Sequence, residues 1–484
     1  MTFPFETKTT DGVPHCGMLL GGSWTEGDGP VADVLDKFRL VPVAHLAASS
    51  PTQIGAMIDI AEAAFEADVL TPHDRGAILD RVAALLEARA DDVRRVMQSE
   101  TGFTDADCRN EIARTSLTLR LSAEEARRLA GDLLPVAGAP GQGRRMALTL
   151  RVPLGVVLAV TPFNAPLNTV THKLAPALGA GNTVILKPAG QTPRTACLLA
   201  QLFRDAGLPD GYLQVFHGGG QAVSTAMADD RVRYVAFTGS TEVGRIIQGQ
   251  AGLRRTQMEL GSIAFTLLAA DADLDVALPK VLGAGYRKAG QVCTSIQILL
   301  VHVSLAAEVE RRLAPMVAGL VWGDPAQPGC TTGPLISQGD AERVEAWIGE
   351  AVAGGARLLA GGTRDGAAVA PTLLSDVSSS MKVGCREIFG PVMCIERFSD
   401  FDAAIARVNG TPYGLATGIF TNRLDSALAA ARRLRVGGVH VNETSSSRVD
   451  LMPYGGTKES GFGREGPHYA MREMTEERVV SFTA

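Results

Sequence analysis

The sequence predicts an α/β protein built around parallel β-sheet, and three observations support this fold class. Between residues 155 and 250, short apolar runs alternate with amphipathic segments, as strands alternate with helices in a parallel sheet. A second strand-and-helix segment begins after Gly261 and extends to about Asn442. The 484 residues are 46% hydrophobic and 20% charged, which is typical of a folded protein of about three structural units.

The region before residue 131 is predicted to be helical. A Ser-Pro start and apolar residues at helical spacing predict a first helix over 51–68. A second helix is expected over 74–99, with Gly102 beyond its end, and a third over 110–130.

A long β-hairpin is predicted over 132–151, because two β-like runs flank a Gly/Pro-rich turn at 138–143. We expect this hairpin to leave the body of the domain and to serve oligomerisation. A final strand is expected at 478–482.

The remaining elements follow from short apolar runs and their breakers. A helix opens at Pro193 and closes before Gly207, and another is expected over 305–320. The expected strands are 155–163, 182–189, 213–218, 234–240 and 298–303. Ligands bind at the C-terminal ends of parallel strands, so residues that follow these runs are candidates for a site.

Composition excludes several classes of protein. The 46 Lys and Arg against 52 Asp and Glu leave a net charge of −6, which offers no basic surface for nucleic acid. The N-terminus lacks a secretory signal pattern, and apolar runs such as 155–160 are far shorter than the ~20 residues that span a bilayer. Seven dispersed cysteines without Cys-x-x-Cys spacing favour a reducing cytosol and argue against structural zinc. We expect a soluble, cytoplasmic protein with no metal, membrane or nucleic-acid partner.

Two positions are candidates for binding phosphate groups. Gly239 and Ser240 lie where an apolar strand meets a helix, so their N–H groups could face a pyrophosphate. Lys187 ends another expected strand at the same sheet edge. The residue pattern alone leaves a plain turn and a solvated surface lysine as alternatives.

The reactive groups are weighed in the same way. Cys197 and Cys394 lie in apolar segments and are expected to be core residues. Cys293, in GQVCTS between a small-residue helix and a strand, could present its sulfur to a cleft, while Cys330 and Cys385 also occupy loops and remain competitors. Glu259 is the last residue of a short apolar run. A carboxylate is unusual at such a position unless it caps a helix, forms an ion pair or takes part in the chemistry.

Seven ordered motifs together resemble the NAD(P)-dependent aldehyde dehydrogenase superfamily. They are TPFNAPLNTVTHKLAPALGAGN (161–182), LKPAGQTP (186–193), FTGSTEVGR (237–245), MELGS (258–262), GQVCTS (290–295), EIFGPV (387–392) and MPYGGTKESGFGREG (452–466). The resemblance implies homodimers or homotetramers whose subunit has a Rossmann-like cofactor domain, an α/β catalytic domain and a bridging β-hairpin. The implied division is cofactor domain 1–131 and 152–261, catalytic domain 262–442, oligomerisation arm and strand 132–151 and 467–484, and substrate loop and return segment 443–466.

The same resemblance assigns catalytic roles. Cys293 would attack the aldehyde as thiolate, and the Asn164 amide with the Cys293 N–H would hold the oxyanion. Glu259 would activate the water that hydrolyses the thioester. Lys173 and Glu465 would orient the site or relay protons. The implied cofactor residues are Thr161, Phe163, Lys187, Gly190, Gly220, Gly239, Ser240, Glu387 and Phe389.

Substrate residues are inferred from PLNTVTHK and NETSSSRVDLMPYGG, which resemble the lactaldehyde, phosphonoacetaldehyde and glyceraldehyde-phosphate subgroup. Ala165 should widen the tunnel, and His172 should line it with the loop 443–452. Val292 stands where relatives with anionic substrates often have Arg, which disfavours a phosphorylated or phosphonate substrate. Arg120 and Arg448 could still supply cations.

The cofactor is expected to be NADP or NAD, with NADP favoured. NAD-preferring relatives commonly have Glu where this chain has Gly190, and a missing carboxylate removes repulsion of a 2′-phosphate. Lys187 and Arg194 could attract that phosphate, and the alternative is a glycine that accepts both cofactors. The enlargement at Ser262, where relatives have Gly, has no interpretation from sequence.

The expected reaction is oxidation of a small-molecule aldehyde to the acid through a cysteine thiohemiacetal and thioester. Transfer of the acyl group to CoA is the alternative, and Glu259 argues for water instead. A cofactor-independent cysteine hydrolase would not need the motifs at 187, 239 and 387, and a catalytically silent relative would lack Cys293, Glu259 or Asn164.

Overall fold

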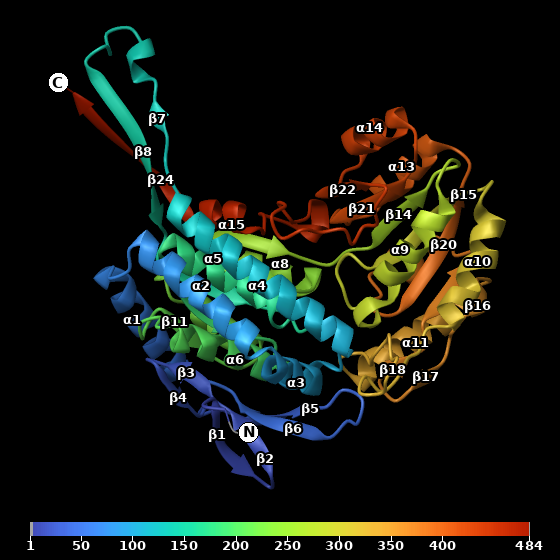
Figure 1. The fold of residues 1–484 in the computed structure, drawn as a ribbon, viewed down its shortest axis with the longest axis horizontal. Helices are drawn as coiled ribbons and strands as arrows, with labels where there is room; N and C mark the ends of the chain where they lie inside the picture. The colour runs from blue at the N-terminus through green and yellow to red at the C-terminus, as the bar shows by residue number, and fades with distance from the viewer. Residues whose placement is uncertain (1–2, 484) are drawn as a thin grey trace.

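The computed structural model describes residues 3–483, which form two α/β bodies and a projecting arm (Figure 1). The first body contains an eight-stranded sheet whose five central strands run parallel. Its order is β23 (Gly461–Phe462), β13 (Arg255–Glu259), β12 (Val232–Thr238), β9 (Val156–Val160), β10 (Thr183–Lys187), β11 (Leu213–Val215), β3 (Met18–Leu20) and β4 (Ser23–Thr25). The predicted α/β class is confirmed.

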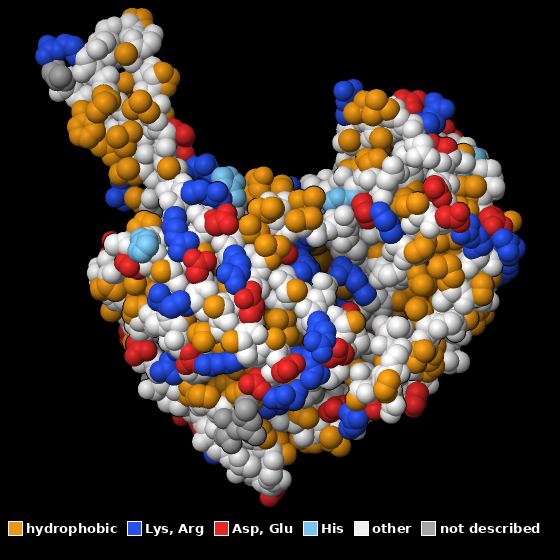
Figure 2. All heavy atoms as spheres, in the orientation of Figure 1, with side chains coloured by type: hydrophobic (Ala, Val, Ile, Leu, Met, Phe, Trp, Pro, Cys, Tyr) orange, Lys and Arg blue, Asp and Glu red, His pale blue; other side chains and the backbone are white. Residues whose placement is uncertain are grey.

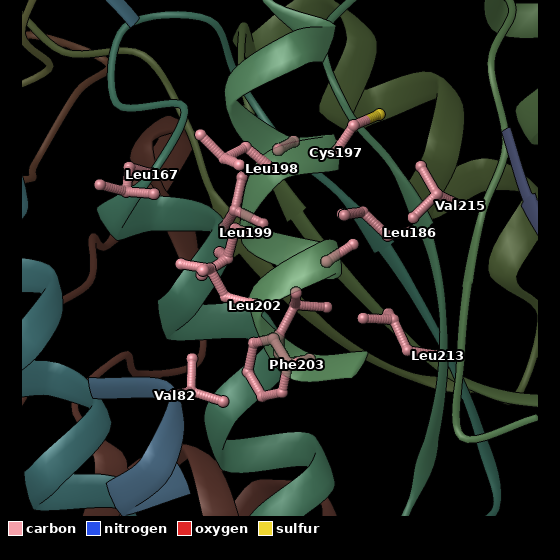
Figure 3. Close-up of a cluster of buried hydrophobic side chains, with 14 of the residues drawn as sticks. Val82, Leu167, Leu186, Cys197, Leu198, Leu199, Leu202, Phe203, Leu213 and Val215 are labelled. Atoms are coloured by element: carbon pink, nitrogen blue, oxygen red, sulfur yellow. The ribbon is translucent and has the colours of Figure 1, made fainter. Parts of the chain in front are cut away.

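Helices cover this sheet and supply its core. Figure 3 shows Leu198, Leu199, Leu202 and Phe203 of one helix in the same buried cluster as Leu186 and strand β11, in agreement with their complete or near-complete burial. The helices are α1 (Pro51–Ala67), α2 (Pro72–Ala88), α3 (Ala90–Thr101), α4 (Asp105–Arg128), α5 (Asn168–Ala180), α6 (Pro193–Asp205), α7 (Gly220–Met227), α8 (Thr241–Ala251) and α15 (Pro467–Glu473).

The second body is built on a seven-stranded sheet that is parallel except for its edge strand β16. Its order is β16 (Arg357–Ala360), β19 (Thr372–Ser375), β20 (Val392–Phe398), β15 (Ile296–His302), β14 (Ala264–Leu268), β21 (Ala416–Phe420) and β22 (Gly438–Val441). Its helices are α9 (Leu274–Tyr286), α10 (Ala306–Ala318), α11 (Gln338–Ala353), α12 (Lys382–Cys385), α13 (Phe401–Asn409) and α14 (Leu424–Arg433).

The short strands near the N-terminus were not predicted from the sequence. They are three to six residues long and partly exposed, so the hydrophobic alternation is too short to recognise. Two of them are β3 and β4 of the large sheet. The others form a four-stranded sheet in the order β1 (Glu6–Thr10), β2 (Val13–Cys16), β6 (Pro42–Ala47) and β5 (Val31–Leu35). The second body also contains a two-stranded pair, β17 (Arg364–Asp365) with β18 (Ala368–Val369).

The single helix predicted over 74–99 is instead two helices, α2 and α3, separated at Arg89. Arg89 has φ −108° and ψ 20°, outside the helical region, and its guanidinium pairs with Asp205 at the end of α6. Both helices pack on α4 and on α6, and α2 makes the larger contact with α4. The apolar stripe continues through the break, so periodicity alone could not reveal it. Gly102 ends α3 in the left-handed region at φ +70°, as its position predicted.

The arm is a three-stranded antiparallel sheet of β7 (Leu133–Leu134), β8 (Arg145–Pro153) and β24 (Thr475–Thr483). It confirms the predicted hairpin and final strand, and Figure 1 shows it extending away from both bodies. Apolar side chains gather on it in Figure 2, and Leu133, Val479 and Phe482 are 74%, 63% and 52% exposed. Within residues 3–483, no helix is both long and apolar enough to cross a bilayer.

Candidate active site

A cavity of about 620 Å³ lies where strands β9, β10 and β12 end, between the two bodies. The cavity lies at the C-terminal ends of parallel strands, where α/β sheets bind ligands. Its lining includes all the predicted cofactor residues except Gly190, namely Thr161, Phe163, Lys187, Gly220, Gly239, Ser240, Glu387 and Phe389. Asn164, Glu259 and Cys293 line the same cavity. Residues from six of the seven motifs therefore meet at one place.

Cys293 lies in the turn that precedes β15, and its Sγ is 2.7 Å from the hydroxyl of Tyr454. Burial raises the pKa of the Cys293 thiol well above its ordinary value, and the nearby Glu259 carboxylate raises it further. The resting sulfur is therefore a neutral thiol. Neither loop competitor lines the cavity, since Cys330 Sγ donates to the Thr332 carbonyl and Cys385 Sγ to the Ser380 carbonyl.

An unusual backbone segment holds this turn. Lys288 and Ala289 have φ of +50° and +53°, in the left-handed region that non-glycine residues rarely adopt. The buried Lys288 ammonium lies 2.7 Å from Glu111 Oε2 and donates to the Asn164 carbonyl at 2.9 Å. Gly290 follows at φ +69°, where a Cβ would lie 2.0 Å from the Gly390 carbonyl oxygen. This ion pair and close backbone packing hold the segment that aims Cys293.

Glu259 is the last residue of β13 and is 3% exposed. Burial raises the pKa of its carboxyl to about 7, with a further contribution from the negative charge of Glu465. Tyr454 donates to Glu259 Oε1 at 3.3 Å. A carboxyl that titrates near neutral pH suits general base work.

Asn164 follows β9, and its Nδ2 donates to the Gln291 carbonyl at 2.8 Å. An amide nitrogen carries two hydrogens, so this bond orients the group and leaves the second hydrogen for an oxyanion. The amide is thus fixed against the turn that carries Cys293.

Lys173 and Glu465 form a buried ion pair with Nζ–Oε1 2.8 Å, and Lys173 also donates to Gln257 at 2.8 Å. Arg448 pairs with the other Glu465 oxygen at 2.9 Å. Although burial opposes ionisation, the charges of Lys173 and Arg448 hold the pKa of Glu465 well below its usual range. Neither Lys173 nor Glu465 lines the cavity, and Glu465 acts on it through its charge on Glu259.

Several features of the cavity fit a nicotinamide nucleotide. The Thr161 hydroxyl lines it, is buried and has no hydrogen-bond partner within residues 3–483, so it is free to bind a ligand. Ser240 caps α8 by accepting from the Val243 N–H, which places a helix N-terminus at the cavity wall. Beside it, Gly239 leaves space that a Cβ would fill, 2.5 Å from the Phe237 ring.

The opposite wall comes from the second body. Glu387 accepts from the Ser262 N–H at 2.8 Å, and burial raises the pKa of its carboxyl to about 7. The ring of Phe389 lies edge-on to Phe163 with centroids 5.8 Å apart. The buried Ser262 hydroxyl has no hydrogen-bond partner in the described part of the chain, and nothing in the structure explains why it replaces glycine.

Gly190 lies between two lining residues, Ala189 and Gln191. A Cβ there would meet only Leu46 Cδ2, at 3.8 Å, so a side chain fits. The structure argues against Arg194 as a phosphate ligand, because its guanidinium is paired with Glu6 at 2.6 Å and bonded to Ser99. Lys187 forms no ion pair within residues 3–483 and remains available.

The predicted substrate cations are not brought to the thiol as free charges. Arg120 lies on the surface of α4 and pairs with Glu87 at 2.8 Å, away from the cavity. Arg448 is mostly buried, paired with Glu465 and placed over the Tyr454 ring at 3.9 Å. His172 is buried and joins Arg448 to Asp450, with contacts of 3.0 Å to each. Ala165 and Val292, next to Asn164 and Cys293, are partly buried.

Sequence reasoning missed two residues, Arg287 and Tyr454. Arg287 is partly buried and donates to Ser446 Oγ at 3.3 Å, and Ser446 in turn bonds to Thr294, next to Cys293. Arg287 could have been found from the sequence, because it lies six residues before Cys293 in a segment of small residues. Tyr454 lies 161 residues from Cys293 in sequence, and no local pattern pointed to it.

Comparison with known proteins agrees with this geometry. The sequence model that describes the aldehyde dehydrogenase family matches residues 24–480 of this chain. The 3-sulfolactaldehyde dehydrogenase of Priestia aryabhattai is 42% identical over 469 residues, which cover 97% of this chain and 98% of that protein.

Two solved structures share the fold throughout. The crystal structure of aldehyde dehydrogenase 21 from Physcomitrella patens, in complex with the reaction product succinate, has a TM-score of 0.94 and 35% identity, covering 97% of this chain and 98% of that one. The NADP-dependent glyceraldehyde-3-phosphate dehydrogenase from Bacillus halodurans C-125, complexed with NADP, has a TM-score of 0.94 and 32% identity, covering 96% and 99%.

Proposed function

This chain belongs to the aldehyde dehydrogenase family, and we propose that its aldehyde substrates carry a single negatively charged group at the end remote from the carbonyl. Family membership makes the chain an oxidoreductase that converts an aldehyde to the carboxylic acid with NAD or NADP. The charged class is supported by the relatives: sulfolactaldehyde carries a sulfonate, and succinate carries a second carboxylate.

The observation that carries this proposal is the guanidinium of Arg287. It is partly buried close to the thiol, and within residues 3–483 it forms no ion pair and bonds only to Ser446 Oγ. Burial lowers the pKa of Arg287, and the neighbouring positive charge of Arg114 lowers it further, so an anion placed there gains a poorly solvated partner. One guanidinium suits a sulfonate or carboxylate, and Val292 leaves no second cation beside Cys293 for a phosphate dianion.

We assign the steps to this chain's residues as follows. The Cys293 thiolate attacks the carbonyl carbon, while the free N–H of Asn164 and the Cys293 N–H hold the oxyanion. The residues that line the cavity would hold NAD(P)⁺, which would supply the acceptor for the hydride lost from the aldehyde carbon. Glu259 then takes a proton from the water that hydrolyses the thioester. The negative charge of Glu465, which Lys173 holds in place through an ion pair, raises the pKa of Glu259.

Replacing Arg287 tests the substrate class. Arg287→Met should raise KM for succinate semialdehyde and 3-sulfolactaldehyde about 10- to 100-fold, since a charged hydrogen bond contributes about 1.5–3 kcal/mol. Steady-state kinetics with butanal, a neutral aldehyde of the same chain length as succinate semialdehyde, should change little.

Arg120→Met is the matched control, because Arg120 pairs with Glu87 on the surface and should leave all KM values unchanged. Equal losses with butanal and with the anionic aldehydes would contradict a charge-specific role for Arg287.

The cofactor side of the proposal is that NADP⁺ is used at least as efficiently as NAD⁺. Gly190→Glu adds a carboxylate where the structure has room for it. Two like charges about 4 Å apart repel by ~4 kcal/mol at a surface-like dielectric before salt screening. We expect the ratio of kcat/KM for the two cofactors to move toward NAD⁺ by about 10- to 100-fold, measured at one ionic strength. An unchanged ratio would show that another part of the pocket selects the cofactor.

We also propose that segments 1–131 and 152–261 bind the cofactor, that 262–442 carries the thiol, and that the arm joins protomers into a dimer or tetramer. The exposed apolar residues Leu133, Val479 and Phe482 support the last point, because isolated chains rarely leave such a surface in water. Light scattering that returned the 50.8 kDa of one chain would contradict it.

A cytoplasmic location is proposed from the cysteines. All seven are free thiols, which suits a reducing compartment. Recovery of the enzyme in a periplasmic or secreted fraction would argue against this location.

A further inference from the structure

The hydroxyl of Tyr454 lies between the two reactive groups of the site. Its oxygen is 2.7 Å from Cys293 Sγ and 3.3 Å from Glu259 Oε1. A phenol can accept one hydrogen bond while it donates another. The Tyr454 hydroxyl oxygen therefore contacts both the nucleophile Cys293 and the base Glu259.

The backbone holds this hydroxyl in place. Tyr454 and Glu465 exchange both main-chain hydrogen bonds, at 3.1 and 2.7 Å. The guanidinium of Arg448 lies over the Tyr454 ring at 3.9 Å, and Arg448 is itself paired with Glu465. A cation against the ring face withdraws electron density from the phenol, which makes its hydroxyl a stronger donor.

The chemistry needs such a connection. Burial and the charge of Glu259 keep Cys293 a neutral thiol, yet only the thiolate attacks an aldehyde. The departing proton needs an acceptor, and the Glu259 carboxylate at the other end of this contact is a base with a pKa of about 7. Burial, with a contribution from the charge of Glu259, raises the pKa of Tyr454 well above its usual range, so the hydroxyl keeps a proton to donate.

Resting on the proposed function, we propose that Tyr454 is a catalytic residue that relays the thiol proton of Cys293 to Glu259. The S–H bond breaks as its proton moves to the Tyr454 oxygen, and the Tyr454 O–H bond breaks as that proton moves to Glu259 Oε1. The products are a thiolate, an intact phenol and a protonated carboxyl. Glu259, whose pKa is about 7, releases this proton to solvent before it serves as the base in hydrolysis. The hydroxyl, whose proton is then directed at sulfur, stabilises the thiolate until it attacks.

The charged groups around Tyr454 favour proton transfer from Cys293 to Glu259. Arg448 and Lys173 are the cations facing it, Glu465 is the anion paired with both, and the charge of Arg287 acts on Cys293. His172 is buried against Arg448, and burial together with that charge lowers its pKa, so it adds no positive charge near neutral pH. The transfer moves one negative charge from Glu259 to sulfur and leaves the total unchanged.

The test is Tyr454→Phe, which keeps the ring under Arg448 and removes only the hydroxyl. We expect alkylation of Cys293 by iodoacetamide, followed by mass spectrometry of its peptide without aldehyde present, to slow about tenfold at pH 7. Its pH midpoint should rise by about one unit, since one unit corresponds to a tenfold change in thiolate fraction. At high pH, where the thiol ionises without help, the variant should match the unmodified enzyme. The rate of the first turnover of reduced cofactor should fall in parallel.

Tyr469→Phe is the control, because Tyr469 is 37% exposed on α15 and should leave both rates unchanged. An unshifted midpoint for Tyr454→Phe, or a loss by one factor at every pH, would overturn the relay and leave Tyr454 a packing residue. Because alkylation needs no aldehyde, a shifted midpoint in an enzyme that rejects every anionic aldehyde would reject the proposed substrate class alone.

Discussion

Cys293→Ser is expected to lower steady-state aldehyde oxidation by at least about 1,000-fold while leaving nucleotide binding intact. A serine hydroxyl is a far poorer nucleophile than a thiolate at neutral pH, and the volume at the site hardly changes. Binding should persist because the cofactor residues line the cavity from other elements. Absorbance of the reduced cofactor measures the first quantity, and fluorescence titration with NADP⁺ the second.

Cys330→Ser and Cys385→Ser serve as controls, since both thiols lie in loops outside the cavity. Each should retain nearly full activity. Substantial turnover by Cys293→Ser, with either control inactive, would move the nucleophile to another position.

Glu259→Gln should separate acylation from hydrolysis. The thioester forms before water is activated, so a burst of reduced cofactor with an amplitude near one per site should remain. Steady-state turnover should fall about 10²- to 10⁴-fold, which is the usual contribution of a general base. Stopped-flow absorbance records the burst and the following slow phase in one experiment. Because the proposed relay also delivers the Cys293 thiol proton to Glu259, the burst should form more slowly in this variant. Loss of burst amplitude in the same proportion as turnover would mean that no thioester forms and that Glu259 is structural.

The pH dependence supplies a second check on the same residue. The pKa of Glu259 is raised to about 7, and the active base is the ionised carboxylate. Hydrolysis should therefore be fastest above pH 7 and should fall about tenfold per unit below it. In Glu259→Gln this acid limb should be absent. An acid limb that persists in the variant would belong to another group.

Most of the fold could be predicted because its signals are local. Strands β9, β10 and β12 are continuous apolar runs, and the capping box at Ser50 and Gln53 with Pro51 in the first turn marks the start of α1. The misses have two causes: a tertiary contact that breaks an unchanged pattern, and strands too short to show one. Arg89 breaks a helix whose apolar stripe runs on, and β3 and β4 are too short to show alternation.

The sequence by itself determined the α/β class, the family and the motifs that contain Cys293, Glu259 and Asn164, since each depends on a short run of neighbouring residues. Only the tertiary structure decided which charges remain free. It neutralised Arg194 with Glu6, Arg120 with Glu87 and Arg448 with Glu465, and it left Arg287 without an ion pair among residues 3–483. It also brought the Tyr454 hydroxyl to Cys293 across 161 residues of chain. The physical reason is that a charge or hydroxyl acts through the groups within a few ångströms of it, and folding draws those groups from parts of the chain that no local pattern connects.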